Sequence, residues 1–228
     1  MTASAGAASL RPRAASRALS ATRRFPTRTA ATIYDRAVAA VRPERLHFTG
    51  DDEADALIAR DPLALLIGFV CDQQVPLQRA FAAPLELKRR LGSLDAETIA
   101  GLDAGELEEA FRRKPALHRF PGTMAQRTQD LCAAVVSEYG GDAERVWTEA
   151  ESGRDLYDRL LGLPGIGEMK VRSLVAIVGN RFGIKPPGWD EVAPKHPSLG
   201  DVDSPEALAA YQEKKRAHKA RLRSQQQG

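Results

Sequence analysis

The stretch "LPGIGEMK", residues 163–170, decides the fold, because it joins two amphipathic segments through a turn with one proline and two glycines. The glycines permit positive φ angles and let another backbone come close. A helix that starts after Gly167 points unpaired N–H groups outward, and these groups favour an anion together with the helix dipole. Ile166, between the glycines, is placed to fill the core between two helices. The turn is therefore either a plain helix–helix corner or a backbone site for a phosphate.

The segments on both sides of this turn have helical hydrophobic periodicity. We expect a short helix over residues 155–161 and an apolar helix from about 168 to 181. Further upstream, Asp61-Pro62 provides an N-cap and a first-turn proline for the apolar segment LALLIGFVCDQQ, which should end at Gln73-Gln74.

Other periodic segments are also helical. The segment after Gln74 reads as a helix bent or interrupted at Pro84. The capping-box spacing at Thr123 predicts the start of a helix through Tyr139, and residues 203–205 predict the start of a last, polar and basic helix. With no convincing strand and no internal repeat, the expected architecture is all-α.

The charge of the 228-residue chain is distributed unevenly. Residues 1–34 contain six Arg and no acid, and residues 213–228 contain six Lys or Arg and one Glu, so the total of +3 leaves −8 for residues 35–212. A protein that binds nucleic acid through a broad basic face would carry a positive core. Any nucleic-acid binding must therefore rest on local backbone contacts and a few cations.

The composition also limits the cofactors and the cellular setting. No apolar run approaches the length of a membrane span, so we expect a soluble protein, in the cytoplasm. Cys71 and Cys132 lie in apolar windows, which suits buried free thiols in a reducing compartment. Two cysteines are too few for an iron–sulfur cluster or a four-cysteine zinc site, and the histidines have no metal-ligand spacing.

Three segments are expected along the chain: a disordered basic tail over 1–34, a helical domain over 35–200, and a basic C-terminal helix and tail over 201–228. The Arg-rich, Ser-rich and acid-free tail also fits an organelle transit peptide, a flexible extension or a mis-assigned start.

From about Asp61 to Asp190, the chain resembles the helix-hairpin-helix Gly/Pro/Asp (HhH-GPD) DNA glycosylase superfamily. The resemblance rests on the order short helix, Leu-Pro-Gly-Ile-Gly, polar residues at 168 and 170, and apolar helix, and the Ala- and Arg-rich composition is similar to that of actinobacterial members. It implies a cluster-free helix-hairpin-helix fold and a monomer that binds double-stranded DNA containing a damaged base. It also implies a Na⁺ or K⁺ ion on hairpin carbonyls as the one plausible metal.

The resemblance assigns DNA contacts to two segments. In the family, a Gln-containing turn after an apolar helix inserts into the duplex near the lesion, and here that turn carries Gln73 and Gln74. The hairpin would hold the DNA phosphate through Leu163, Pro164, Gly165, Ile166, Gly167, Glu168 and Lys170. Phe120 or Met124 would be the wedge on the lesion side, and Trp189 would either stack on an extruded base or anchor its loop on the core.

The resemblance also nominates a catalytic carboxylate. Family members use an aspartate after the hairpin's second helix, because a carboxylate stabilises the sugar cation that forms as the base departs. Asp190 lies at the family spacing, seven residues after Phe182-Gly183. The segment before it is about three residues longer than usual, and Pro194 soon stops any helix. Asp190 is therefore either catalytic or an ordinary N-cap.

The nucleophile of strand-cleaving members is a lysine in the hairpin's second helix. Its place falls on Met169, whereas this chain has Lys170, about 100° further round the helix. Lys170 is therefore a candidate catalytic residue, with a phosphate contact as the favoured role and lyase chemistry as the less favoured one.

These expectations leave three readings of the function, an enzyme and two alternatives. The enzyme is a base-excision glycosylase that hydrolyses the N-glycosidic bond of a flipped base, whose identity the sequence does not reveal. The rival is a DNA-binding helix-hairpin-helix protein without chemistry, and an all-helical scaffold that contacts protein is a third reading.

Overall fold

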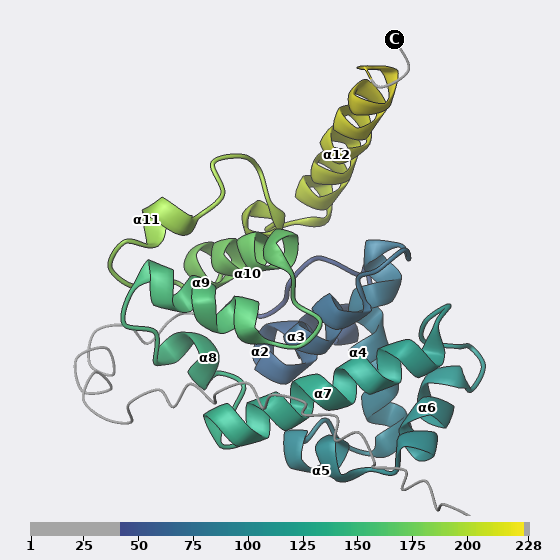
Figure 1. Ribbon diagram of the computed structural model, residues 1–228. Helices are drawn as coiled ribbons and strands as arrows, with labels where there is room; N and C mark the ends of the chain where they lie inside the picture. Colours follow the sequence, from purple (N-terminus) through teal and green to yellow (C-terminus); the bar gives the residue numbers. More distant parts are fainter. Residues whose placement is uncertain (1–41, 226–228) are drawn as a thin grey trace, which may run out of the picture.

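The computed structural model describes residues 42–225, so the predicted tail over 1–34 lies outside the described residues (Figure 1). Within that range the chain is helical and contains no strand, which confirms the all-α prediction. None of the described helices is long and apolar enough to cross a membrane. The helices are α2 (Asp52–Arg60), α3 (Pro62–Cys71), α4 (Leu77–Leu91), α5 (Ala96–Gly101), α6 (Ala104–Arg112), α7 (Pro121–Tyr139), α8 (Arg145–Thr148), α9 (Gly153–Gly162), α10 (Glu168–Asn180), α11 (Trp189–Val192), the 3-10 helix η1 (Leu199–Asp201) and α12 (Pro205–Gln225).

Helix α3 is the centre of the fold. The Asp61 carboxylate accepts hydrogen bonds from the backbone N–H groups of Leu63 (3.0 Å) and Ala64 (3.1 Å), and Pro62 occupies the first turn, as predicted. Every residue from Leu63 to Cys71 is buried, so this helix is apolar all round and packs against α2, α4 and α7. It ends at Cys71, about two residues before the predicted Gln73-Gln74.

Two details of the neighbouring helices differ from the predictions. Helix α4 runs without interruption through Pro84, because its buried face, with Phe81 and Leu85, packs on the core and outweighs the lost hydrogen bond. Helix α7 begins at Pro121 with Phe120 as its N-cap, and not at a Thr123 capping box. A first-turn proline starts this helix, since the fixed φ of proline fits that position.

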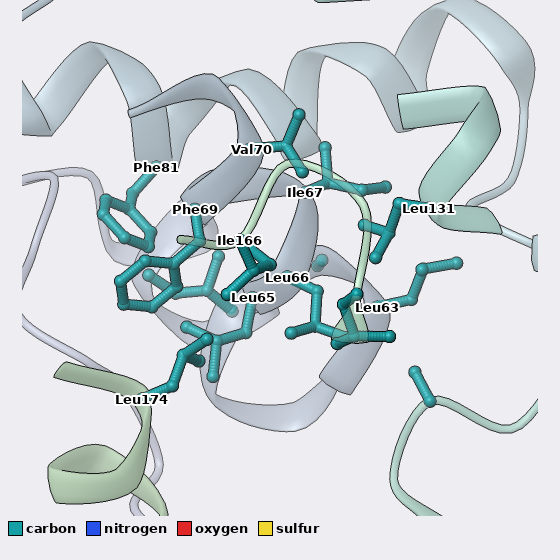
Figure 2. Packing of buried hydrophobic residues seen from close by; sticks show 14 of the residues in the cluster. Leu63, Leu65, Leu66, Ile67, Phe69, Val70, Phe81, Leu131, Ile166 and Leu174 are labelled. Carbon is teal, nitrogen blue, oxygen red and sulfur yellow. The ribbon is translucent and has the colours of Figure 1, made fainter. Parts of the chain in front are cut away.

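Helices α9 and α10 form a hairpin around Leu163–Gly167. The Ser152 side chain caps α9 by accepting from the N–H of Asp155 (3.1 Å), and Gly167 is the N-cap of α10. Ile166 is buried, and Figure 2 shows it among Leu65 and Phe69 of α3. The sequence prediction that Ile166 fills the core is confirmed, and its burial fixes the hairpin to the central helix.

Helix α11 and η1 complete the C-terminal half. Gly153 at the start of α9 leaves room for the Gly188 carbonyl, since a Cβ at Gly153 would lie 2.4 Å from that oxygen. Gly200 packs in the same way on the Ala176 backbone of α10. The expected boundary at residue 200 therefore falls inside η1, which is packed on the helical body. Helix α12 then extends away from that body (Figure 1).

Candidate functional site

The hairpin presents a row of backbone N–H groups that have no acceptor in the described part of the chain. The N–H of Ile166 donates to the Leu163 carbonyl (3.1 Å), and the N–H of Lys170 to that of Gly167 (2.8 Å). The N–H groups from Gly167 to Met169 make no such bond, and no side chain caps the helix at Gly167. Unpaired donors at the positive end of a 13-residue helix suit an anion, so this end of α10 is a candidate anion site.

The predicted contact residues of the hairpin differ in accessibility. Leu163 and Ile166 are buried, whereas Gly167 and Glu168 are exposed. Gly165 has a φ of +80°, which favours glycine, but Gly167 has a φ of −99° that any residue adopts. The predicted contacts through Leu163 and Ile166 are thus restricted to their main chain.

The hairpin is packed against the C-terminal end of α3 and against α7. A Cβ built on Gly165 would lie 3.2 Å from the Val70 side chain and 3.9 Å from Cβ of Arg127. The close-up in Figure 2 shows Val70 and Ile166 in the same cluster. The anion site and the turn after α3 therefore lie side by side, although about ninety residues separate them in the sequence.

The turn after α3 holds its two glutamines differently. Gln73 is half-buried, its side-chain oxygen accepts a hydrogen bond from the Arg127 guanidinium, and its carbonyl oxygen accepts one from His118 Nε2 (2.8 Å). Gln74 is exposed and has a φ of +56°, the one positive value of a non-glycine residue in the described chain. Gln73 fixes the turn, and Gln74 is the glutamine available to enter a duplex.

His118 is a structural residue in this turn. The Phe120 N–H donates to Nδ1 (3.1 Å), so Nε2 carries the proton that it donates to Gln73. Burial lowers the pKa of His118 from 6.5, which keeps the ring neutral. The ring thereby ties the turn after α3 to the loop before α7.

Lys170 points into the hairpin. Its Nζ donates to the Gly165 carbonyl (2.9 Å), while the neighbouring Met169 is 75% exposed. Burial lowers the pKa of Lys170, whereas the nearby charge of Asp72 raises it. The one-residue shift therefore places the amine on the α3 side of the helix. The Lys170 ammonium group occupies the Gly165 carbonyl oxygen, and its positive charge would repel a Na⁺ or K⁺ ion bound to the same oxygen.

Asp72 is a residue that the sequence analysis missed. It is the half-buried C-cap of α3, between the hairpin and the glutamine turn. Burial raises the pKa of its carboxyl group, and the positive charges of Lys215 and Lys170 lower it. Burial raises the pKa of the Tyr211 phenol, and the charge of Asp72 raises it further. An acid directly before Gln73-Gln74 was the available sequence signal.

Asp190 lies at the other end of the hairpin. Trp189 donates through Nε1 to the Val175 carbonyl (3.0 Å) and its ring covers Gly179, which is about 18 Å along α10 from Gly167. Figure 1 shows α11 at the end of α9 and α10 opposite to the loop that joins them. Asp190 is exposed in the second position of α11, with Gly188 as the N-cap, so it is not the N-cap itself. The structure does not bring Asp190 and Lys170 together.

Of the remaining predicted DNA contacts, some side chains are buried and one is exposed. Trp189 is 9% exposed, so it anchors its loop and does not stack on an extruded base. Met124 is buried, which excludes it as a wedge, whereas Phe120 is 41% exposed with the Arg119 guanidinium over its ring. Phe120 alone of the two remains available to a duplex.

Two surface hollows lie away from this site. One, of about 580 Å³, lies between α2 and α4. The other, of about 350 Å³, lies beside α11 and is lined by Arg154, Arg172, Lys195 and His196 among others. Neither is lined by Asp72, Lys170 or Asp190.

The two cysteines are free and buried, and burial raises the pKa of each thiol to about 12. Within residues 42–225, no group of three or more His, Cys, Asp or Glu side chains is arranged to hold a metal ion.

Comparison with known proteins agrees with this geometry. The profile of the HhH-GPD superfamily of base excision DNA repair proteins matches residues 67–218, about two thirds of the chain. The matched range includes the glutamine turn, the hairpin, α11 and most of α12. The chain therefore belongs to the HhH-GPD superfamily. No curated protein and no solved structure matches.

Membership of this superfamily implies a role in base excision DNA repair and binding of DNA. It confirms the resemblance drawn from the hairpin sequence.

Proposed function

We propose that the protein is a DNA glycosylase that binds as a monomer to double-stranded DNA, flips a damaged base and hydrolyses its N-glycosidic bond. The observation that carries the proposal is the contact between two elements. The hairpin's unpaired N–H groups, from Gly167 to Met169, lie next to the turn that exposes Gln74. One element holds a phosphate and the other fills the gap that a flipped base leaves.

Superfamily membership supports the repair role but leaves the chemistry to be tested. The position of Asp190 at the far end of the hairpin favours the second candidate, a DNA-binding protein without catalysis. Lys170 would be a phosphate neighbour in that case. In an enzyme, its lowered pKa would also suit attack on the sugar, since only the neutral amine is a nucleophile.

The first experiment combines a lesion panel with one backbone variant. Duplexes carrying single lesions are incubated with the protein and treated with hot alkali, which converts abasic sites into strand breaks. A lesion-specific break establishes the glycosylase, and breaks without alkali assign a lyase role to Lys170. DNA binding without any break on the whole panel establishes the second candidate.

The backbone variant is Gly167→Ala. Its Cβ would meet no atom within 4 Å and its φ of −99° suits alanine, so the cost in stability is at most about 1 kcal/mol. The methyl group lies on the exposed N-cap where a phosphate would approach, so affinity for duplex DNA should fall about tenfold or more, because a hydrogen bond to a charged group is worth about 1.5–3 kcal/mol. Gly101→Ala on α5, which is equally unobstructed, is the matched control. Equal DNA affinity of the two variants would contradict the hairpin site.

A further inference from the structure

Cleavage of a glycosidic bond requires a carboxylate close to the sugar. The bond breaks towards a cation on the sugar ring, and a fixed negative charge stabilises that cation. If the phosphate binds at Gly167, the reacting sugar lies within one nucleotide of the hairpin turn. Asp190 is exposed and directly follows Trp189, which packs on Val175 and Gly179, about 12–18 Å along α10 from that turn.

Asp72 is the half-buried carboxylate that the fold places beside the hairpin turn, where Glu168 is the exposed one. It follows Val70 by two residues, and the Val70 side chain contacts the hairpin at Gly165. It precedes Gln73, which Arg127 and His118 hold in place. The Asp72 backbone N–H donates to the Phe69 carbonyl (3.2 Å), so the residue is fixed as the last part of a rigid, buried helix.

The charges around Asp72 come from three elements. Lys170 approaches from α10, Lys215 and Tyr211 from α12, and burial of the site raises the affinity of the carboxyl group for a proton. The two lysines oppose that effect and favour the carboxylate. A partly desolvated carboxylate with nearby cations suits a base that takes up and releases a proton during the reaction.

We propose that Asp72 is the catalytic carboxylate of this site, in the place that the sequence assigned to Asp190. This inference rests on the proposed glycosylase function. As the bond between C1′ and the base breaks, its electron pair leaves with the base, which takes a proton from solvent. Asp72 stabilises the positive charge on the sugar and accepts a proton from the water whose oxygen bonds to C1′. The products are the free base and an abasic sugar, and Asp72 returns its proton to solvent.

The test uses two abasic-site analogues, so that the identity of the damaged base does not matter. One duplex carries a cationic pyrrolidine in place of the sugar, and the other carries a neutral tetrahydrofuran. A site built to stabilise a sugar cation binds the cationic analogue more tightly, as enzymes bind transition-state analogues. The ratio of the two dissociation constants is measured for wild type, Asp72→Asn and Asp190→Asn.

We expect wild type to prefer pyrrolidine by about 100-fold or more. Asp72→Asn should lower that preference by about tenfold or more and leave tetrahydrofuran binding intact, because only the charge is removed. Asp190→Asn, the matched control, should retain the preference. Retention in Asp72→Asn, or loss of tetrahydrofuran binding together with pyrrolidine binding, would overturn the assignment.

The outcomes also separate this inference from the proposed function. If wild type binds neither analogue better than intact duplex, the glycosylase proposal fails. If it binds both equally, damage recognition stands and the role of Asp72 is overturned. If Asp72→Asn does not fold, Asp72→Glu serves as the test of the role of Asp72, since it retains the charge but moves the carboxylate by one methylene. It should keep tetrahydrofuran binding and lose part of the preference, and an unchanged preference would contradict the role.

Discussion

At the scale of single residues, Gln74 is the side chain that the fold holds in an unfavourable conformation. Its φ of +56° is left-handed, and such a conformation costs an ordinary residue roughly 1–2 kcal/mol. The neighbouring bonds of Gln73 to Arg127 and His118 impose this geometry. Strain at an exposed residue beside an anion site is typical of a functional position.

Replacing this residue separates strain from function. Gln74→Gly should leave the free energy of unfolding unchanged or raise it by up to about 1 kcal/mol, because glycine adopts positive φ freely but loses more chain entropy. The same variant should bind tetrahydrofuran duplexes more weakly, since no side chain fills the gap in the helix. Thermal melting and DNA titration check the two effects, and wild-type affinity in the variant would contradict the insertion of Gln74.

His118 makes stability depend on pH near neutrality. Because burial lowers its pKa in the folded protein below 6.5, the unfolded chain binds a proton here at higher pH than the folded chain does. The free energy of unfolding should therefore decrease as pH falls below about 6.5, by at most about 1.4 kcal/mol per pH unit. Above that pH the contribution is constant.

The measurement compares His118→Gln with wild type by chemical denaturation between pH 5 and 8. The variant should lose this part of the pH dependence, and the exposed His196→Gln should keep it. A wild-type slope of the opposite sign would mean that the ring is charged in the folded protein.

At the scale of elements, the contact of α11 with α10 decides where Asp190 lies. Gly179→Ala would place a Cβ 2.3 Å from the Trp189 ring, although alanine otherwise favours a helix. We expect a loss of about 1–3 kcal/mol and a melting temperature lower by about 2–4 °C per kcal/mol. Gly162→Ala on α9, whose Cβ meets nothing within 4 Å, should melt like wild type.

DNA affinity well below the melting temperature should be the same in both glycine variants, because α11 packs at the end of the hairpin opposite to the turn at Leu163–Gly167. A higher melting temperature for Gly179→Ala would mean that Trp189 does not anchor α11.

The same elements show what the sequence could predict. Local signals identified the hairpin and the start of α3, since Gly165, Gly167 and Asp61-Pro62 act through neighbouring backbone atoms. The role that we propose for Asp72 was not visible in the sequence, because Lys170 and Lys215, whose charges act on it, are about one hundred residues or more away in the chain. The spacing of Asp190 after Phe182-Gly183 gives its position along the chain but not the course of the loop that carries it. The fit of Trp189 on Gly179 determines its actual course.

At the scale of the whole molecule, the charge is separated. Residues 35–212 carry a net charge of −8, and residues 213–228 carry +5. Helix α12 passes near Asp72 with Tyr211 and Lys215, which lie in its first half and its middle. Its C-terminal part extends away from the helical body (Figure 1). A duplex bound at the hairpin would therefore have the basic helix α12, the basic arm, on one side and the acidic helical body elsewhere. This charge separation favours one orientation of the duplex on the protein.

The contribution of this arm is measured by salt dependence. Substituting the exposed Lys214, Arg216 and Arg221 with Gln should lower the slope of log K against log salt concentration by about 0.9 for each DNA phosphate that the arm no longer neutralises. Substituting the exposed Arg60 at the end of α2 and Lys88 and Arg89 in the last turn of α4 removes equal charge and should leave the slope nearly unchanged. Equal effects of both triple variants would mean that only total charge matters.

The burial of both thiols has a practical consequence. Cys71 and Cys132 are fully buried and protonated, so alkylating and oxidising reagents cannot react with them until the chain opens locally. The labelling rate of each thiol under native conditions therefore reports how often the structure around that cysteine opens locally. Since Cys71 adjoins Asp72 and Cys132 lies within α7, the chain contains one reporter beside the proposed catalytic carboxylate and one in the scaffold, without any engineered probe.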